Sequence, residues 1–158
     1  MPPSIRSTDV QPAPAPQFLS GAGSSRPGSA SDRPAGRTIL LVDDDHGVRV
    51  GLARALRSDG WNVIAAASGA EALERLNEQP PDLLITDLRM AEVSGWDLLF
   101  HERLHRPDMP IFVISALQPA VLAGVERFAT GFFQKPLDLD LLLGAVRHRL
   151  GFSVQPTT

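Results

Sequence analysis

The chain of 158 residues carries a net charge of −3 and contains no cysteine. The lack of cysteine excludes disulfide frameworks, zinc–thiolate sites and thiol nucleophiles, and the weak acidity offers no basic surface to nucleic acid. No apolar run is long enough to cross a membrane, and the N-terminus lacks the apolar segment of a secretory signal. We therefore expect a cytoplasmic protein with one folded domain and no direct contact with nucleic acid or membrane.

The N-terminal segment differs in composition from the rest of the chain. It is rich in proline, serine and alanine, and it contains a single aromatic residue, Phe18. Such a segment cannot bury enough apolar surface to offset the entropy lost on ordering. We predict a disordered tail over residues 1–36, a folded domain over 37–150 and a short C-terminal tail over 151–158.

Apolar and amphipathic stretches alternate through the predicted domain. Short apolar runs are typical of buried strands, and they lie at 38–42, 61–66, 82–86, 110–115 and 131–134. Five amphipathic stretches predict helices at 46–60, 68–81, 94–105, 119–129 and 137–150. This alternation predicts an α/β domain with a doubly wound, five-stranded parallel sheet and right-handed crossovers between the strands.

Several of the predicted helices carry end signals. Asp45 is a plausible N-cap of the first helix and Gly60 its terminator, while Ser68 and Glu71 have the spacing of a capping box. In the stretch 94–105 the helical spacing predicts one apolar face, made of Trp96, Leu99, Phe100 and Leu104.

Polar residues follow four of the five predicted strands. The carboxyl ends of parallel strands meet at one edge of the sheet, where the ligand crevice of such folds lies. The residues predicted at that edge are Asp43, Asp44, Asp45, Asp87, Ser115 and Lys135. Lys135 is the only lysine of the chain, beside fourteen arginines, and its ammonium is a compact point charge whereas guanidinium is a planar fork.

Each of these residues also has a structural explanation. Asp45 can be a helix cap, Asp43 and Asp44 a solvated loop, Ser115 a turn residue and Lys135 an ordinary surface lysine. Together they favour a site, because separate loops have no reason to supply complementary chemistry at one edge. Close carboxylates repel unless they are neutralised, and with no cysteine and no suitably placed histidine the expected cation is Mg²⁺.

This set of residues predicts phosphoryl transfer. Asp87 would be the nucleophile, since a carboxylate can form an acyl phosphate. Lys135 would neutralise charge on the transferred group, and the Ser115 hydroxyl could donate to a phosphoryl oxygen once one is present. The ligands of Mg²⁺ would be Asp43, Asp44, Asp87 and the backbone carbonyl of Arg89.

The stretches TILLVDDDHGVR, PDLLITDLRM, SGWDLL, PIFVISA and FFQKPL together resemble the receiver domain of bacterial two-component response regulators, over residues 37–150. The resemblance implies a flavodoxin-like fold with sheet order 2-1-3-4-5, a phosphoacceptor at Asp87 and a cis peptide bond before Pro136. It also implies the other roles: metal binding for Asp43 and Asp44, phosphoryl contact for Lys135, and switching for Ser115 and Phe132, whose ring turns inward.

The sequence departs from the family pattern in two places. Ala91 stands where the family commonly has proline, and the interval from Ser115 to Lys135 is two residues shorter than usual. The shortening affects the surface that receivers use for output, so partner identity and the mode of dimerisation stay open.

The resemblance implies a stand-alone receiver that signals through protein contacts. A sensor histidine kinase or a histidine phosphotransfer protein would supply the phosphoryl group, and a downstream protein would read the switched surface. The chain would not be an enzyme beyond self-phosphorylation and self-dephosphorylation. Alternatives are an aspartate-nucleophile phosphatase or phosphotransferase, which usually needs a second aspartate where this chain has Arg89, an unphosphorylated receiver-like scaffold, and a piece of a larger regulator.

Overall fold

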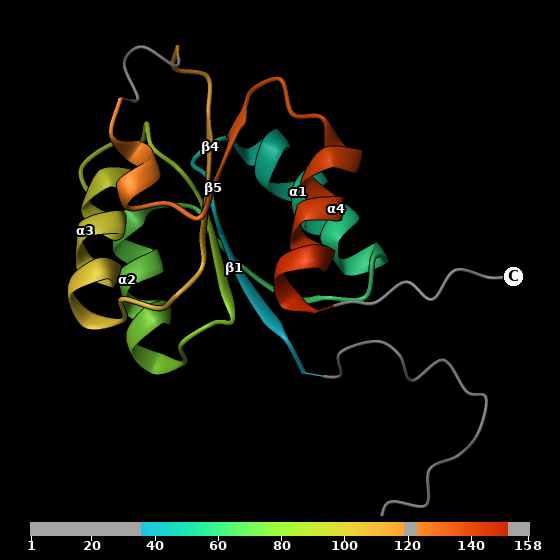
Figure 1. The fold of residues 1–158 in the computed structure, drawn as a ribbon, viewed down its shortest axis with the longest axis horizontal. Helices are drawn as coiled ribbons and strands as arrows, with labels where there is room; N and C mark the ends of the chain where they lie inside the picture. Colours follow the sequence, from blue (N-terminus) through green and yellow to red (C-terminus); the bar gives the residue numbers. More distant parts are fainter. Residues whose placement is uncertain (1–35, 119–122, 152–158) are drawn as a thin grey trace, which may run out of the picture.

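The computed structural model describes residues 36–118 and 123–151 and shows one parallel sheet with helices on both faces (Figure 1). The strands are β1 (Thr38–Val42), β2 (Asn62–Ala66), β3 (Leu83–Asp87), β4 (Ile111–Ser115) and β5 (Gly131–Gln134). The helices are α1 (His46–Ser58), α2 (Gly69–Glu78), α3 (Gly95–His105) and α4 (Leu139–Leu150), with a short 3-10 helix η2 (Val125–Arg127). The strand order β2-β1-β3-β4-β5 confirms the predicted doubly wound fold.

The sheet separates two apolar cores. The side chains of β1, β3 and β4 are buried along their whole length, which explains why these strands are continuous apolar runs. Figure 1 shows α2 and α3 on one face of the sheet and α1 and α4 on the other. Alternate residues of each central strand, such as Leu40 and Leu41 of β1, point into opposite cores.

Capping side chains set the helix starts. Asp45 caps α1 by accepting from the Val48 backbone N–H, as predicted, and Gly60 follows the helix with a φ of 102°. Ser68 caps α2 by accepting from the Glu71 backbone N–H, while the Glu71 carboxylate accepts from the Ala67 backbone N–H. None of the helices within 36–118 and 123–151 is long and apolar enough to span a membrane.

The predicted apolar face of α3 is wrong. Phe100 and Leu104 are 51% and 80% exposed, whereas Leu98 and the carboxylate of Glu102 are fully buried together with Leu99. A buried glutamate at this position could not be expected from hydrophobic periodicity, because its burial depends on the charges that neutralise it.

The predicted helix at 119–129 is not found in the part of it that the structure describes. Residues 119–122 lie outside the described ranges, and the remainder forms η2, preceded by Gly124 with a φ of 95°. The described ranges therefore hold four α-helices where the sequence predicts five. The predicted tails also lie outside the described ranges, apart from Gly36 and Gly151.

Candidate functional site

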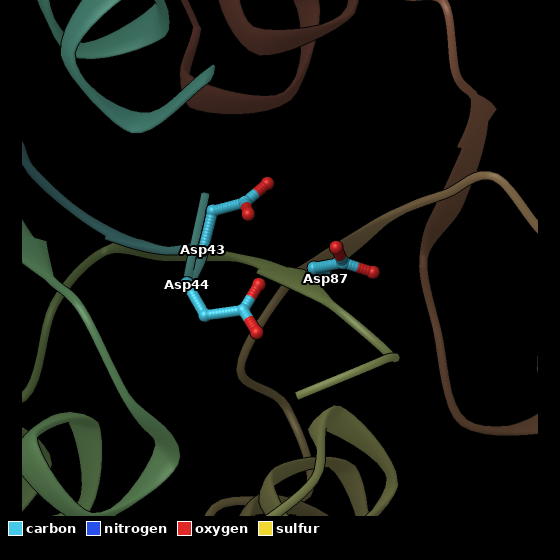
Figure 2. Close-up of side chains that lie close together, drawn as sticks. All are labelled: Asp43, Asp44 and Asp87. Carbon is cyan, nitrogen blue, oxygen red and sulfur yellow. The ribbon is translucent and has the colours of Figure 1, made fainter. Parts of the chain in front are cut away.

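Three aspartates lie together at the carboxyl edge of the sheet. Asp87 is the last residue of β3, and Asp43 and Asp44 follow β1, whose final residue Val42 pairs with Thr86. One carboxylate oxygen from each aspartate lies within 4.8 Å of the others, and Figure 2 shows the three side chains near one another at the ends of the two strands. Asp43 and Asp87 are buried and Asp44 is exposed.

Lys135 joins the two buried aspartates. Its Nζ donates to Asp43 Oδ2 and to Asp87 Oδ2, both at 2.8 Å. The residue follows β5, where its backbone N–H donates to the Ser115 carbonyl, and the peptide bond to Pro136 is cis. The ammonium therefore lies among the acids that the sequence predicted as its neighbours.

Burial governs the electrostatics of this cluster. Burial raises the pKa of Asp43 above its ordinary value, and the nearby charge of Asp87 raises it further, although Lys135 and a backbone N–H act in the opposite direction. Burial alone would lower the pKa of Lys135, but its hydrogen bonds and charge pairing with Asp43 and Asp87 outweigh burial and raise it. The lysine is thus held as a cation between two carboxylates.

Backbone donors orient the same carboxylates. The Asp45 N–H donates to Asp43 Oδ1 at 2.9 Å, and the Arg89 N–H donates to Asp87 Oδ1 at 3.0 Å. These bonds leave further lone pairs on each carboxylate, and Asp44 adds an exposed one. An all-oxygen, strongly acidic donor set of this kind fits a hard cation such as Mg²⁺.

Ser115 ends β4 at the same edge and is fully buried. Its Oγ accepts from the Leu117 backbone N–H at 3.1 Å, so the hydroxyl hydrogen stays available to a new acceptor. Phe132 of β5 pairs with Val113 of β4 and packs, half-buried, against the core beneath α2 and α3. The hydroxyl and the ring thus belong to neighbouring strands at the side of the site.

Gly95 is a site residue that the sequence analysis missed. A Cβ built there would lie 2.0 Å from the Asp87 backbone oxygen, so α3 can begin this close to the acidic residue only with glycine. The Ser94 side chain caps the same helix in a reciprocal capping box with Asp97. The Ser-Gly pair before an amphipathic stretch was the available signal.

Sequence comparisons relate the chain to signalling proteins. A profile of the response regulator receiver domain matches residues 39–147. The transcriptional regulatory protein GlrR of Escherichia coli (strain K12) is 38% identical over 121 residues, 75% of this chain and 27% of GlrR. Response regulator MprA of Mycobacterium leprae (strain TN) is 36% identical over 111 residues, 69% of this chain and 49% of MprA. The chain thus spans about a quarter to a half of the length of these relatives.

Solved structures show the same fold. A response regulator receiver protein from Pseudomonas putida matches with a TM-score of 0.67 and 34% identity, over 71% of this chain and 96% of that one. The response regulator TrrA from Thermotoga maritima, solved in complex with Mg²⁺-BeF, matches with a TM-score of 0.67 and 26% identity, over 72% of this chain and 98% of TrrA. The profile match runs from β1 into α4 and includes every residue of the acidic site.

Proposed function

The chain belongs to the response regulator receiver domain family, and from this premise we propose that Asp87 accepts a phosphoryl group from a phosphohistidine donor. The observation that supports this most strongly is the contact of one ammonium, Lys135 Nζ, with both Asp87 and Asp43 at 2.8 Å. It places a fixed positive charge beside the carboxylate where a phosphoryl group would add negative charge.

The proposed reaction is an in-line transfer to a carboxylate oxygen. Asp87 attacks the phosphorus of the donor, the new O–P bond forms, and the N–P bond of phosphohistidine breaks. The electron pair of that bond stays on the imidazole nitrogen, which takes up a proton. The product on this chain is an acyl phosphate at Asp87.

The residues around Asp87 have separate roles in this proposal. The Arg89 backbone N–H and Lys135 hold the carboxylate in place, and Lys135 then shares its charge with the phosphoryl oxygens. Asp43 and Asp44 would hold Mg²⁺, with Asp87 and the Arg89 carbonyl as further ligands, and the ion would supply charge neutralisation. Burial of Asp43 at 0% exposure keeps its carboxylate oriented by protein donors rather than by water.

Phosphorylation would change the surface through Ser115 and Phe132. The added phosphoryl oxygens are strong acceptors for the free hydroxyl hydrogen of Ser115. Movement of that hydroxyl opens space next to β5, and Phe132 would turn inward to fill it. The affected surface comprises β5, η2 and the adjoining part of α4, and a downstream protein would bind there.

The partners follow from the same proposal. A sensor histidine kinase or a histidine phosphotransfer protein would be the donor, and the chain would act as a signalling phosphoacceptor with at most self-phosphorylation and self-dephosphorylation. Two of the relatives' names refer to transcriptional regulation, so the comparisons give no support to the expected absence of nucleic-acid contact. The domain boundaries at 37 and 150 and the cytoplasmic location stay predictions.

Incubation with acetyl phosphate and Mg²⁺ tests the proposal. We expect Mg²⁺-dependent labelling of the wild-type chain that hydroxylamine removes, and no labelling of Asp87→Asn. Asp108→Asn is the matched control, since Asp108 is an exposed aspartate in the loop after α3, and it should label like the wild type. Equal labelling of Asp87→Asn and the wild type would refute the assignment.

A further inference from the structure

Two histidines lie one helical turn apart near the end of α3. His101 and His105 have the i, i+4 spacing that places side chains on one face of a helix, and their ring centroids are 4.2 Å apart. The His101 side chain is 28% exposed, and His105 is exposed, so both rings can be reached from solvent.

The hydrogen bonds of the two rings fix which nitrogen carries the proton. His105 Nδ1 lies 2.8 Å from the His101 backbone oxygen, which can only accept, so Nδ1 is the donor. His101 Nδ1 lies 3.1 Å from Glu102 Oε1, a carboxylate paired with Arg106, so it is a donor as well. Each neutral ring therefore has its lone pair on Nε2, and no partner of either Nε2 occurs among the residues that the structure describes.

This arrangement is typical of histidines that bind a metal ion. Such histidines donate the second ring N–H to a carboxylate or a backbone carbonyl, which fixes the ring and makes the free nitrogen a better ligand. Here Glu102 supplies the carboxylate for His101, and the His101 carbonyl serves His105. A metal–nitrogen bond of about 2.0–2.1 Å requires two nitrogens within about 4 Å of each other, which is comparable to the spacing of these rings.

We propose that His101 and His105 form a two-histidine binding site for a divalent cation of the Zn²⁺, Ni²⁺ and Cu²⁺ class. Imidazole nitrogens suit these ions, whereas the all-oxygen cluster at Asp87 suits Mg²⁺. The remaining coordination positions are open to water or to a donor from another molecule. The site lies in the last two turns of α3, where the helix dipole favours a cation.

The two-histidine site is separate from the acidic cluster. α3 begins at Gly95 beside Asp87, and a rise of about 1.5 Å per residue puts His101 about 9 Å and His105 about 15 Å further along the helix. The proposal therefore does not rest on phosphorylation of Asp87. An ion bound to both rings would cross-link the last turns of α3 and stabilise them.

Titration of the full chain with NiCl₂ in excess Mg²⁺, followed by calorimetry, tests this proposal. We expect one Ni²⁺ per chain, at least tenfold weaker binding in His105→Ala and in His101→Ala, and unchanged binding in His46→Ala and Asp87→Asn. With Cu²⁺, the paramagnetic spectrum should show two nitrogen donors in the wild type and one in His105→Ala. Ni²⁺ should also raise the unfolding temperature of the wild type and leave that of His105→Ala unchanged.

Three results would overturn the two-histidine site. These are no Ni²⁺ binding by the wild type, equal binding by His105→Ala and the wild type, and loss of binding in Asp87→Asn. Since His105 is exposed, His105→Ala keeps the packed core intact, and circular dichroism confirms that each variant is folded before it is titrated.

Discussion

Replacement of Lys135 by methionine tests the electrostatic account of the site. Methionine keeps an unbranched, flexible side chain but removes the charge that faces two carboxylates, of which Asp43 is 0% and Asp87 9% exposed. Loss of one partner from a buried ion pair costs about 3–5 kcal/mol. Because Lys135 itself is 18% exposed and an aspartate can take up a proton, we expect a loss of about 2–3 kcal/mol near neutral pH without Mg²⁺.

Urea denaturation at several pH values measures this loss. In Lys135→Met the pKa of Asp43, already raised in the wild type by burial, rises further because the opposing cation is gone. A carboxyl with a raised pKa in the folded state binds more protons when folded, so the free energy of unfolding increases as the pH falls. The deficit of the variant should therefore shrink between about pH 7 and about pH 5.

Arg75→Met is the matched control for this experiment. Arg75 forms ion pairs with Glu71 and Glu78 on α2, but its side chain is 45% exposed, so its loss should cost less than about 1 kcal/mol. A loss in Lys135→Met no larger than in Arg75→Met, or a deficit that grows as the pH falls, would refute the electrostatic account.

Three further substitutions or conditions test other parts of the site. Gly95→Ala brings a Cβ to 2.0 Å from the Asp87 backbone oxygen and should cost about 1–3 kcal/mol and slow labelling, whereas Gly51→Ala in α1, where no atom lies within 4 Å, should stabilise by about 0.5–1 kcal/mol in the same denaturation assay. Ser115→Ala should still be labelled by acetyl phosphate but should lose the phosphorylation-dependent shifts of β5 amide resonances; full shifts would contradict its role. Mg²⁺ affinity, followed by tryptophan fluorescence, should weaken as the pH falls, starting above the ordinary range for aspartate because burial raises the pKa of Asp43, and a pH-independent affinity would contradict this.

The sequence predicted the sheet and the meeting of its polar residues well, because both follow from local pattern and topology. The apolar runs mark strands buried on both faces, and in a parallel sheet the residues after such strands share one edge. The contact of Lys135 with Asp43 joins residues 92 apart in the chain, yet the topology rule alone brings them together.

The features that could not be predicted depend on tertiary contacts. Glu102 reads as a polar residue for the solvent face of α3, but Arg106 and His101 neutralise it and it is buried. Arg106 also donates to the Leu76 carbonyl at the end of α2, a contact that periodicity does not contain. Gly95 likewise needs knowledge of how closely α3 approaches Asp87.

Chemical trapping of the acyl phosphate measures the central claim most directly. After phosphorylation with acetyl phosphate and Mg²⁺, borohydride reduces an aspartyl phosphate to homoserine, which peptide mass spectrometry can locate. The account predicts homoserine at position 87 in the wild type, its absence without Mg²⁺, and its strong reduction in Lys135→Met. Homoserine at another aspartate, or none in fully labelled protein, would contradict it.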